Sequence, residues 1–390
     1  MRLRSRLKAI PAIIYTALLV LVCISGPFHE APSDVKPLIG PAPAAEVTLS
    51  CGTYPVETTE LTAVIQSEDI SKLDSLSYLT RADFSGSSCW KEIAEWGQAH
   101  PLLELKYTVT LPDGTVLDNS AAELDLSSLG HAAAAETAEA LACLPAVTHI
   151  KLGAQSAGSD ALTLADIGAI HEACPNAELD YSLTLYGHEI NLSASSLDFR
   201  GTQISDEAAA LAEVLPLMTR CTYLDMDNTG VSNEALAKIR EEFLNIDVVW
   251  RVWFGTNYSV RTDVERILAS KPTVGGMIYD ASVLQYCTKV KYLDLGHNDE
   301  LPSIDFVRNM PELEVLIIAM TAVRDISPLE SCPKLEYLEL NSTNIADISP
   351  LKNSTGLHHL NIAGCPNIKD ISPLYGLTEL ERLWIGCDTP

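Results

Sequence analysis

Few side chains in this sequence have the types and spacing that catalysis or metal binding requires. His171-Glu172 lacks the second histidine, three residues further on, that a zinc-protease helix needs. His358 and His359 are adjacent, so on a strand they would point to opposite faces and could not easily chelate one ion. We interpret this pair as one outward and one partly buried histidine. The sequence also lacks a serine in a glycine-bounded nucleophile elbow and a glycine loop for phosphates or dinucleotides.

Aspartates recur at intervals instead of forming an acid–base pair. Asp125, Asp198, Asp225 and Asp294 each end a short apolar stretch. Such spacing suits one face of repeated strands better than two carboxylates brought together for catalysis. We therefore predict that the chain is not an enzyme and has no catalytic residues, no metal site and no cofactor.

Five segments near the C-terminal end carry apolar residues at their first, fourth and sixth places. They begin at Val290, Leu313, Leu335, Leu357 and Leu380, and successive starts are 22 or 23 residues apart. Apolar residues at these places put one side of a short strand and its approach into a common core. Because one coil has too little apolar area to fold alone, we expect stacked coils that stabilise one another.

The phrase Asp-Ile-Ser-Pro-Leu follows three of these segments, at residues 325–329, 347–351 and 370–374. Proline fixes its own backbone angle and restricts the residue before it, so the Ser-Pro step suits a turn or a short 3-10 segment. Residues 335–351 resemble the 22-residue class of leucine-rich repeats found in internalins and related bacterial surface proteins. The resemblance covers 288–390 and implies a right-handed solenoid with parallel strands along a concave face.

One place in these coils departs from the family pattern. The family has an asparagine ladder whose side chains satisfy backbone groups between coils, and in this sequence Asn298 alone keeps the asparagine. The matching residues are Thr321, Thr343, Cys365 and Asp388. Threonine and cysteine can fill the place, but they offer fewer hydrogen-bonding groups than asparagine.

The upstream part of the chain has a looser and longer repeat. Strand-like passages recur at Glu104 to Leu111, Glu178 to Leu185 and Asp247 to Phe254. Residues 110–116 and 184–190 indicate inserted hairpins, the first with an Asp-Gly turn.

Helical patterns lie between the upstream strands, and Thr163 and Asp206 are plausible caps. They span residues 132–143, 164–174, 207–215 and 233–243. This alternation resembles helix-bearing repeats such as those of ribonuclease inhibitor, which implies an α/β solenoid with helices on its convex side. We predict such an array over 51–254, an irregular joint over 255–287, and the 22-residue repeats over 288–390.

The first residues have a different composition. Basic residues at positions 2 to 8 precede an uncharged stretch from Ala9 to Ser25, which is the order of an export signal. The stretch is at the short end of what spans a bilayer, so we predict a signal peptide or a single N-terminal membrane anchor over 1–25. Prolines concentrate in the following residues, and we predict a semi-stiff linker over 26–50.

Ten cysteines in an exported chain raise the question of disulfides. Five of them fall just before expected strands, namely Cys143, Cys174, Cys221, Cys287 and Cys332. Small buried residues, one per coil, account for that placement better than disulfides do.

The formal net charge of −26 argues against nucleic acid as a partner, because a nucleic-acid site needs a basic surface that releases counterions. The strand-lined face of the C-terminal coils is the surface that remains for a ligand. Its outward places carry Tyr292, Asp294, Val315, Ile317, Tyr337, Glu339, His359, Asn361, Arg382 and Trp384. Tyrosine, tryptophan and arginine dominate binding hot spots, so we predict that this face binds a protein or carbohydrate.

Two other interpretations stay open. The array could be a rigid scaffold or spacer at the cell surface without a tight ligand, its outward apolar residues packing against one another. A less favoured interpretation is a regulator of a hydrolase, or a hydrolase, within the irregular N-terminal array.

Overall fold

The computed structural model describes residues 45–156 and 158–386. The predicted signal peptide or anchor and most of the predicted linker lie outside these residues. The end of the linker segment is regular, because β1 (Glu46–Leu49) pairs with β2 (Gly52–Pro55). Within the described ranges, the helices are all too short or too polar to cross a bilayer.

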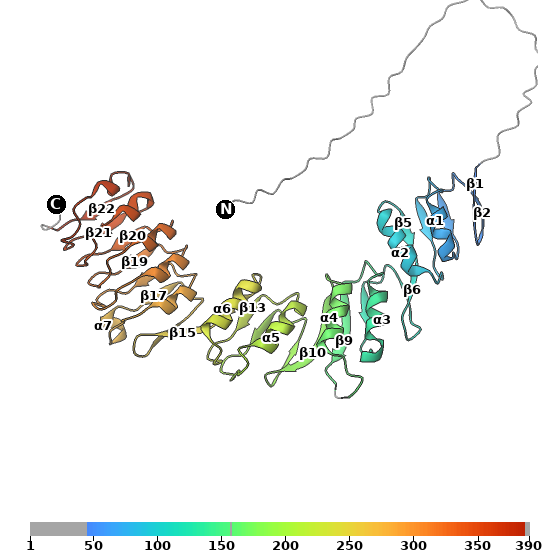
Figure 1. Cartoon of the computed structure of the whole chain (residues 1–390), viewed down its shortest axis with the longest axis horizontal. Coiled ribbons are helices and arrows are strands. Elements are labelled where there is room, and N and C mark those ends of the chain that lie inside the picture. Colours follow the sequence, from blue (N-terminus) through green and yellow to red (C-terminus); the bar gives the residue numbers. More distant parts are fainter. Residues whose placement is uncertain (1–44, 157, 387–390) are drawn as a thin grey trace, which may run out of the picture. The chain divides into compact units, whose positions relative to one another are not determined.

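Three similar units form the helix-bearing array (Figure 1). Each unit contains three parallel strands, one from each of three successive coils. The third strand of each sheet leads into an antiparallel hairpin, after which the next sheet begins. The first unit has β3 (Glu60–Thr62), β4 (Arg81–Asp83), β5 (Glu104–Lys106) and the hairpin β6 (Thr108–Thr110) and β7 (Val116–Asp118). The second has β8 (Glu123–Asp125), β9 (His149–Ala154), β10 (Glu178–Leu185) and β11 (His188–Asn191). The third has β12 (Ser196–Asp198), β13 (Tyr223–Asp225), β14 (Asp247–Val249), β15 (Arg251–Phe254) and β16 (Tyr258–Arg261).

Each helix of this array connects two neighbouring parallel strands, as a parallel sheet requires. The helices are α1 (Ile70–Leu73), α2 (Trp90–Ala99), α3 (His131–Leu141), α4 (Leu164–Ala173), α5 (Ala209–Val214) and α6 (Asn233–Glu242), with 3-10 turns η1 (Ser67–Asp69) and η2 (Leu215–Leu217). The four predicted helices correspond to α3 to α6. The predicted cap at Thr163 is confirmed, since Thr163 Oγ1 accepts from the Asp166 N–H at 3.2 Å. The cap predicted at Asp206 is wrong, because the N-cap of α5 is Ala208; Asp206 lies two residues earlier and accepts from the Ala210 N–H at 3.1 Å.

A buried carboxylate fastens the hairpin β1–β2 to the first coil. Asp69 accepts hydrogen bonds from the Ser50 N–H at 2.8 Å, from the Gln66 N–H at 3.0 Å and from the Ser50 hydroxyl. Lys72 Nζ lies 3.4 Å from the same carboxylate. Burial alone would raise the pKa of Asp69, but these hydrogen bonds outweigh it and lower the pKa to about 2.

Acid should therefore loosen this corner. An unfolded aspartate has a pKa of about 3.9, so the lowered folded pKa of Asp69 contributes stability that is complete above that value and is lost as pH falls toward about 2. We expect the exchange protection of the β1–β2 amides, corrected for intrinsic rates, to fall over that range. Asp69→Asn should be less protected at neutral pH and should lose this pH dependence. An unchanged pH dependence in Asp69→Asn would assign the effect to another group.

The C-terminal coils form one six-stranded parallel sheet in unbroken register. Its strands are β17 (Arg266–Leu268), β18 (Tyr292–Asp294), β19 (Val315–Ile317), β20 (Tyr337–Glu339), β21 (His359–Asn361) and β22 (Arg382–Trp384). The three repeat leucines are in the core as predicted, since Leu335, Leu338 and Leu340 are at most 1% exposed. The stacked coils therefore share a continuous apolar core.

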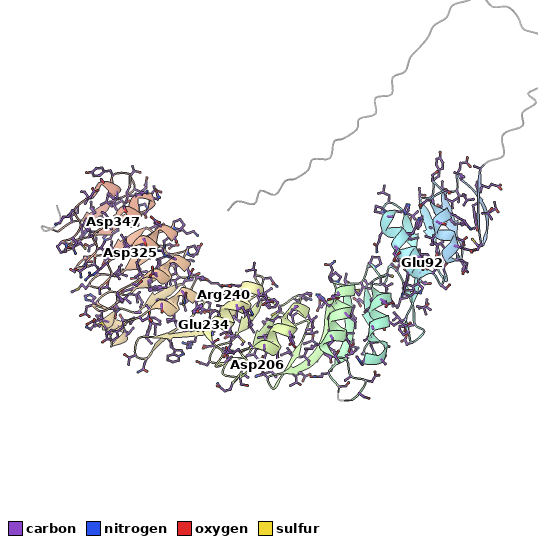
Figure 2. All side chains as sticks on the ribbon, in the orientation of Figure 1. Glu92, Asp206, Glu234, Arg240, Asp325 and Asp347 are labelled. Carbon is purple, nitrogen blue, oxygen red and sulfur yellow. The ribbon has the colours of Figure 1, made fainter. Side chains whose placement is uncertain are left out.

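Short 3-10 turns return the chain between these strands, and three of them begin at the Ser-Pro step that predicted them. They are η3 (Ser282–Tyr286), η4 (Asp305–Asn309), η5 (Ser327–Ser331), η6 (Ser349–Asn353) and η7 (Ser372–Leu374). Asp325 and Asp347 stand at the same place in successive coils (Figure 2), and each accepts the N–H of the serine two residues on at 2.8 Å. The aspartate thus sets the turn, and proline begins the 3-10 segment.

The segment 255–287, predicted to be an irregular joint, contains regular elements. It holds β16, β17, the short helix α7 (Lys271–Val274) and η3. Since β17 is the first strand of the six-stranded sheet, that sheet begins earlier than the predicted repeat boundary at residue 288. The strand escaped detection because Ile267 is its one buried side chain and charged Arg266 precedes it.

The asparagine place is filled by groups that hydrogen-bond in different ways. Asn298 is fully buried and bridges coils, because its Nδ2 donates to the carbonyls of Leu295 at 2.8 Å and Ala269 at 3.0 Å. Thr343 donates within its own coil to Leu340, at 2.7 Å. Cys365 donates across coils to the same carbonyl at 3.2 Å. The matching Asp388 lies outside the described residues.

Four of the five cysteines before the strands pack as small buried residues, as predicted, and the described cysteines form no disulfide. Cys174, Cys221, Cys287 and Cys332 are buried, whereas Cys143 is half-buried. Burial raises the pKa of Cys174 to about 11 and that of Cys332 to about 12, so these thiols stay neutral and unreactive at physiological pH.

Candidate ligand-binding face

All ten residues predicted to bind a ligand lie on one side of the six-stranded sheet, in two parallel ladders. The pairing of β18 to β22 aligns Tyr292, Val315, Tyr337, His359 and Arg382 in the first ladder and Asp294, Ile317, Glu339, Asn361 and Trp384 in the second. The leucine between each pair points away from this face, because successive side chains of a strand face opposite sides, and on β18 to β21 that leucine is buried in the core. We call this surface the strand-lined face.

Two residues of the strand-lined face were missed in the sequence. Arg266 precedes Tyr292 in the first ladder, and Leu268 precedes Asp294 in the second. A signal for them exists, because Arg266-Ile-Leu268 follows the hairpin β15–β16 as Glu123-Leu-Asp125 follows β6–β7. The third hairpin itself was not recognised, and its following strand was lost with it.

Several side chains of the face pack against one another. The Arg266 guanidinium lies 4.3 Å from the centroid of the Tyr292 ring, a cation–π contact. The rings of Tyr337 and His359 are stacked, with centroids 4.1 Å apart and an interplanar angle of 5°. The Tyr337 hydroxyl donates to the Glu339 carboxylate. Burial and this carboxylate raise the pKa of Tyr337 to about 12, so the phenol stays protonated and keeps donating.

Polar atoms in and beside that stack have no hydrogen-bond partner among the described residues. Both ring nitrogens of His359 are buried and make no hydrogen bond to any described residue, although Nε2 is 4.0 Å from Glu339 Oε1. Asn341, just after β20, likewise has a buried Oδ1 without a partner. Buried groups without hydrogen bonds cost free energy, so a ligand that reached them would gain by pairing with them.

Trp384 is the most accessible aromatic side chain of the ladders, at 58% exposed. It lies on β22, the last strand of the sheet, where the core positions are also partly open. Leu383 and Ile385 are each 39% exposed, whereas Leu360 and Ile362, their equivalents on the preceding coil, are fully buried. Trp384 is therefore the aromatic residue of the strand-lined face that a ligand can reach most readily.

Two of the repeats that carry this face match a known family. Residues 311–353 match the family model of leucine-rich repeats, in two copies. The chain therefore contains leucine-rich repeats. No curated protein matches its sequence.

Solved leucine-rich-repeat structures are similar to this one at low sequence identity. An internalin of Listeria monocytogenes is 16% identical, with 85% of this chain and 76% of that chain covered and a TM-score of 0.27. A leucine-rich-repeat protein of Leptospira interrogans is 12% identical, with coverages of 84% and 94% and a TM-score of 0.30. The functional domain of the internalin InlJ of Listeria monocytogenes, described as including a cysteine ladder, is 14% identical, with coverages of 86% and 65% and a TM-score of 0.29.

The recurring aspartates accept hydrogen bonds from the backbone. Asp125, Asp198, Asp225 and Asp294 each accept the N–H of the residue two positions on, at 2.9 to 3.1 Å. Such a bond fixes the turn that leaves the strand. No group of three His, Cys, Asp or Glu that could hold a metal occurs in the described ranges.

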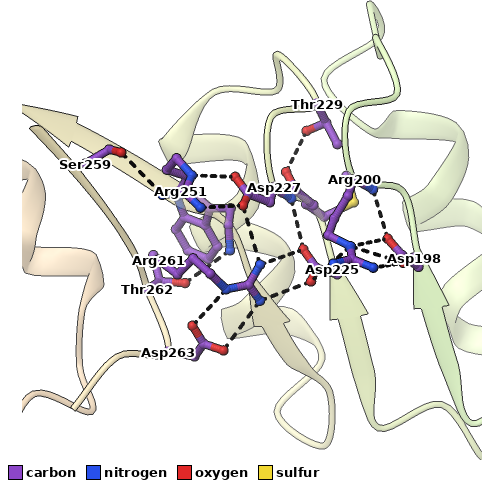
Figure 3. A network of polar contacts seen from close by, with 12 residues as sticks. Asp198, Arg200, Asp225, Asp227, Thr229, Arg251, Ser259, Arg261, Thr262 and Asp263 are labelled. Carbon is purple, nitrogen blue, oxygen red and sulfur yellow. Dashed lines mark hydrogen bonds and ion pairs between the residues drawn. The ribbon is translucent and has the colours of Figure 1, made fainter. Parts of the chain in front are cut away.

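Charged side chains form a dense network on the third unit (Figure 3). Arg251 and Arg261 are paired across the hairpin β15–β16. Arg251 donates to Asp227 at 2.9 and 3.0 Å, and Arg261 donates to Asp225 at 3.0 Å and to Asp263 at 3.2 Å. Asp225 and Asp227 are almost buried, with side chains 7% and 9% exposed. The network therefore fastens the hairpin to the sheet β12–β14.

Proposed function

We propose that this chain is an extracytoplasmic leucine-rich-repeat protein that binds a protein or carbohydrate ligand through the strand-lined face. The observation that carries the proposal is the combination of aromatic side chains in both ladders with buried polar atoms that lack partners among the described residues. Tyr292, Tyr337 and Trp384 supply large contact area, and His359 and Asn341 supply the unpaired groups. Such residues contribute most where water is excluded from a packed contact.

Charge narrows the class of ligand. The net charge of −26 favours a neutral carbohydrate, or a protein with basic residues around its contact surface, over a polyanion. The basic and then apolar order of the first residues supports export, with cleavage or retention as an anchor both open.

Substitutions on the strand-lined face should weaken binding without unfolding the array. A photo-reactive amino acid in place of Trp384 in the full chain would capture a ligand for identification, and the same group in place of Lys352 on η6 serves as control. We expect Trp384→Ala to lower the affinity for that ligand by about thirtyfold, since an interface anchor contributes about 2 kcal/mol. Tyr337→Phe, which keeps the stack on His359 and removes the hydroxyl, should weaken it less.

Lys352→Ala provides the matched control, because Lys352 is exposed on the return turn η6 rather than on a strand. Equal affinities for the parent chain, Trp384→Ala and Lys352→Ala would mean that the ligand does not bind the strand-lined face. Crosslinks from position 352 as strong as those from 384 would lead to the same conclusion.

The packing of Arg266 on Tyr292 and of Tyr337 on His359 favours one alternative, a scaffold or spacer. Side chains that satisfy one another can cover a sheet without any ligand. This alternative predicts that no ligand is captured at position 384.

A further inference from the structure

The three hairpins of the helix-bearing array differ at one exposed position. Thr110, Thr184 and Trp253 each lie two residues after the first paired residue of their hairpin. All three side chains are exposed, and that of Trp253 is 59% exposed. Two hairpins of the same design form with threonine at this position, so the fold does not require tryptophan there.

Trp253 borders a hollow of about 500 Å³. Arg251 and Trp253 on β15 line one side, the loop after β13 from Asn228 to Ser232 lines another, and Gln203 of the preceding coil completes it. The volume lies within the range of small-molecule sites, about 300 to 1,000 Å³. The walls are mainly polar, and Trp253 provides a large exposed aromatic surface.

The walls of this hollow are held in place by their own contacts. Asp227 fixes Arg251, as described above, and buried Trp250 donates from its ring N–H to Asn233 at 2.9 Å. Glu207 accepts from both the N–H and the hydroxyl of Ser232. A preorganised site binds more tightly because less freedom is lost when the ligand arrives.

Two amide side chains at the rim have unused hydrogen-bonding capacity. The Asn228 side chain makes no hydrogen bond among the described residues, and Asn228 itself has a left-handed backbone with φ of 58°. Gln203 makes one long side-chain bond there, from Nε2 to the Asn228 carbonyl at 3.4 Å. Each amide offers two donor hydrogens and an acceptor oxygen, which matches sugar hydroxyls that both donate and accept.

We propose that this hollow is a binding site for a neutral saccharide, distinct from the strand-lined face. The apolar C–H face of a pyranose ring packs on Trp253, and its hydroxyls pair with the amides of Asn228 and Gln203. An anion is disfavoured, since Arg251 is already neutralised by Asp227, and the carboxylate of Glu207 lies beside the hollow, where it accepts from Ser232, the N-cap of α6. The site lies on other strands than β17 to β22, so it does not depend on the proposed function.

The probes are neutral hexasaccharides of glucose, mannose, galactose and N-acetylglucosamine, titrated into the full chain. Heat release and tryptophan fluorescence are followed together. We expect saturable binding of at least one probe, weakened about tenfold or more in Trp253→Thr. Asn228→Gly should weaken it several-fold, because glycine keeps the left-handed backbone without strain and removes the amide. Trp253→Thr should melt with the parent chain, since the other two hairpins already carry threonine.

Two controls locate the bound sugar. Leu244→Ala changes a side chain that is 87% exposed elsewhere on the same unit and should leave the affinity unchanged. Lys352→Ala, on the exposed turn η6, should also leave it unchanged. Loss of sugar binding in Trp384→Ala but not in Trp253→Thr would overturn this inference while supporting the strand-lined face. Equal affinity of Trp253→Thr and the parent chain, or no saturable binding of any probe, would overturn it as well.

Discussion

Replacing Leu338 by alanine is expected to lower the free energy of unfolding by about 2–5 kcal/mol. Leu338 is fully buried on β20, between the equally buried Leu316 of β19 and Leu360 of β21. The truncation leaves a cavity that stacked coils cannot close without shifting, and each coil depends on its neighbours for burial. We expect chemical denaturation to show the loss, and hydrogen exchange to show lower protection in β19 and β21 as well.

A matched leucine tests whether burial is the cause. Leu383 has the same repeat position on β22 but is 39% exposed, so Leu383→Ala should cost clearly less than Leu338→Ala. Lys352→Ala, on an exposed turn, should stay within about 0.5 kcal/mol of the parent chain. Equal losses for the two leucines would contradict a core shared between coils.

Replacing Asp225 by alanine is expected to cost about 3–5 kcal/mol. Its side chain is 7% exposed and accepts from Arg261 at 3.0 and 3.3 Å and from the Asp227 N–H at 3.1 Å. Without the Asp225 carboxylate, the largely buried guanidinium of Arg261 keeps its charge but loses one of its main ion-pair partners. Burial lowers the pKa of Arg261, but its bonds to Asp225 and Asp263 outweigh this and raise it, so the guanidinium stays charged. Denaturation in urea measures the loss.

Asp198→Ala is the matched comparison for Asp225→Ala, because Asp198 belongs to the same network of charged side chains but is exposed. Its side chain is 55% exposed, and its partner Arg200 is 60% exposed. Asp198→Ala should therefore cost below about 1 kcal/mol, as exposed ion pairs do. A small effect for Asp225→Ala, similar to that for Asp198→Ala, would show that the hairpin β15–β16 is held by its apolar face instead. That face includes Val252 and Phe254, which are 1% and 5% exposed.

The C-terminal repeats could be predicted from the sequence because their signal is local. Each repeat of 22 or 23 residues contains a strand, a return turn and core leucines. Because the same pattern returns in the coils that start at Leu313, Leu335 and Leu357, each repeat supports the assignment of the next. Helices α3 to α6 were found for a similar reason, since an apolar face and a cap lie close in sequence. The strand β17 was missed because a single buried residue, Ile267, gives no periodicity.

The sequence by itself determined the repeat, the register of the two ladders and the burial of the leucines, since spacing along the chain fixes which side of a strand each residue occupies. Only the tertiary structure decided which contacts the outward-facing side chains make. It stacked Tyr337 on His359, left the His359 nitrogens without a partner among the described residues, and joined Arg261 to Asp225, which is 36 positions away in the chain. It also opened the hollow beside Trp253. These features depend on contacts between coils and hairpins, which form only when segments distant in sequence pack together.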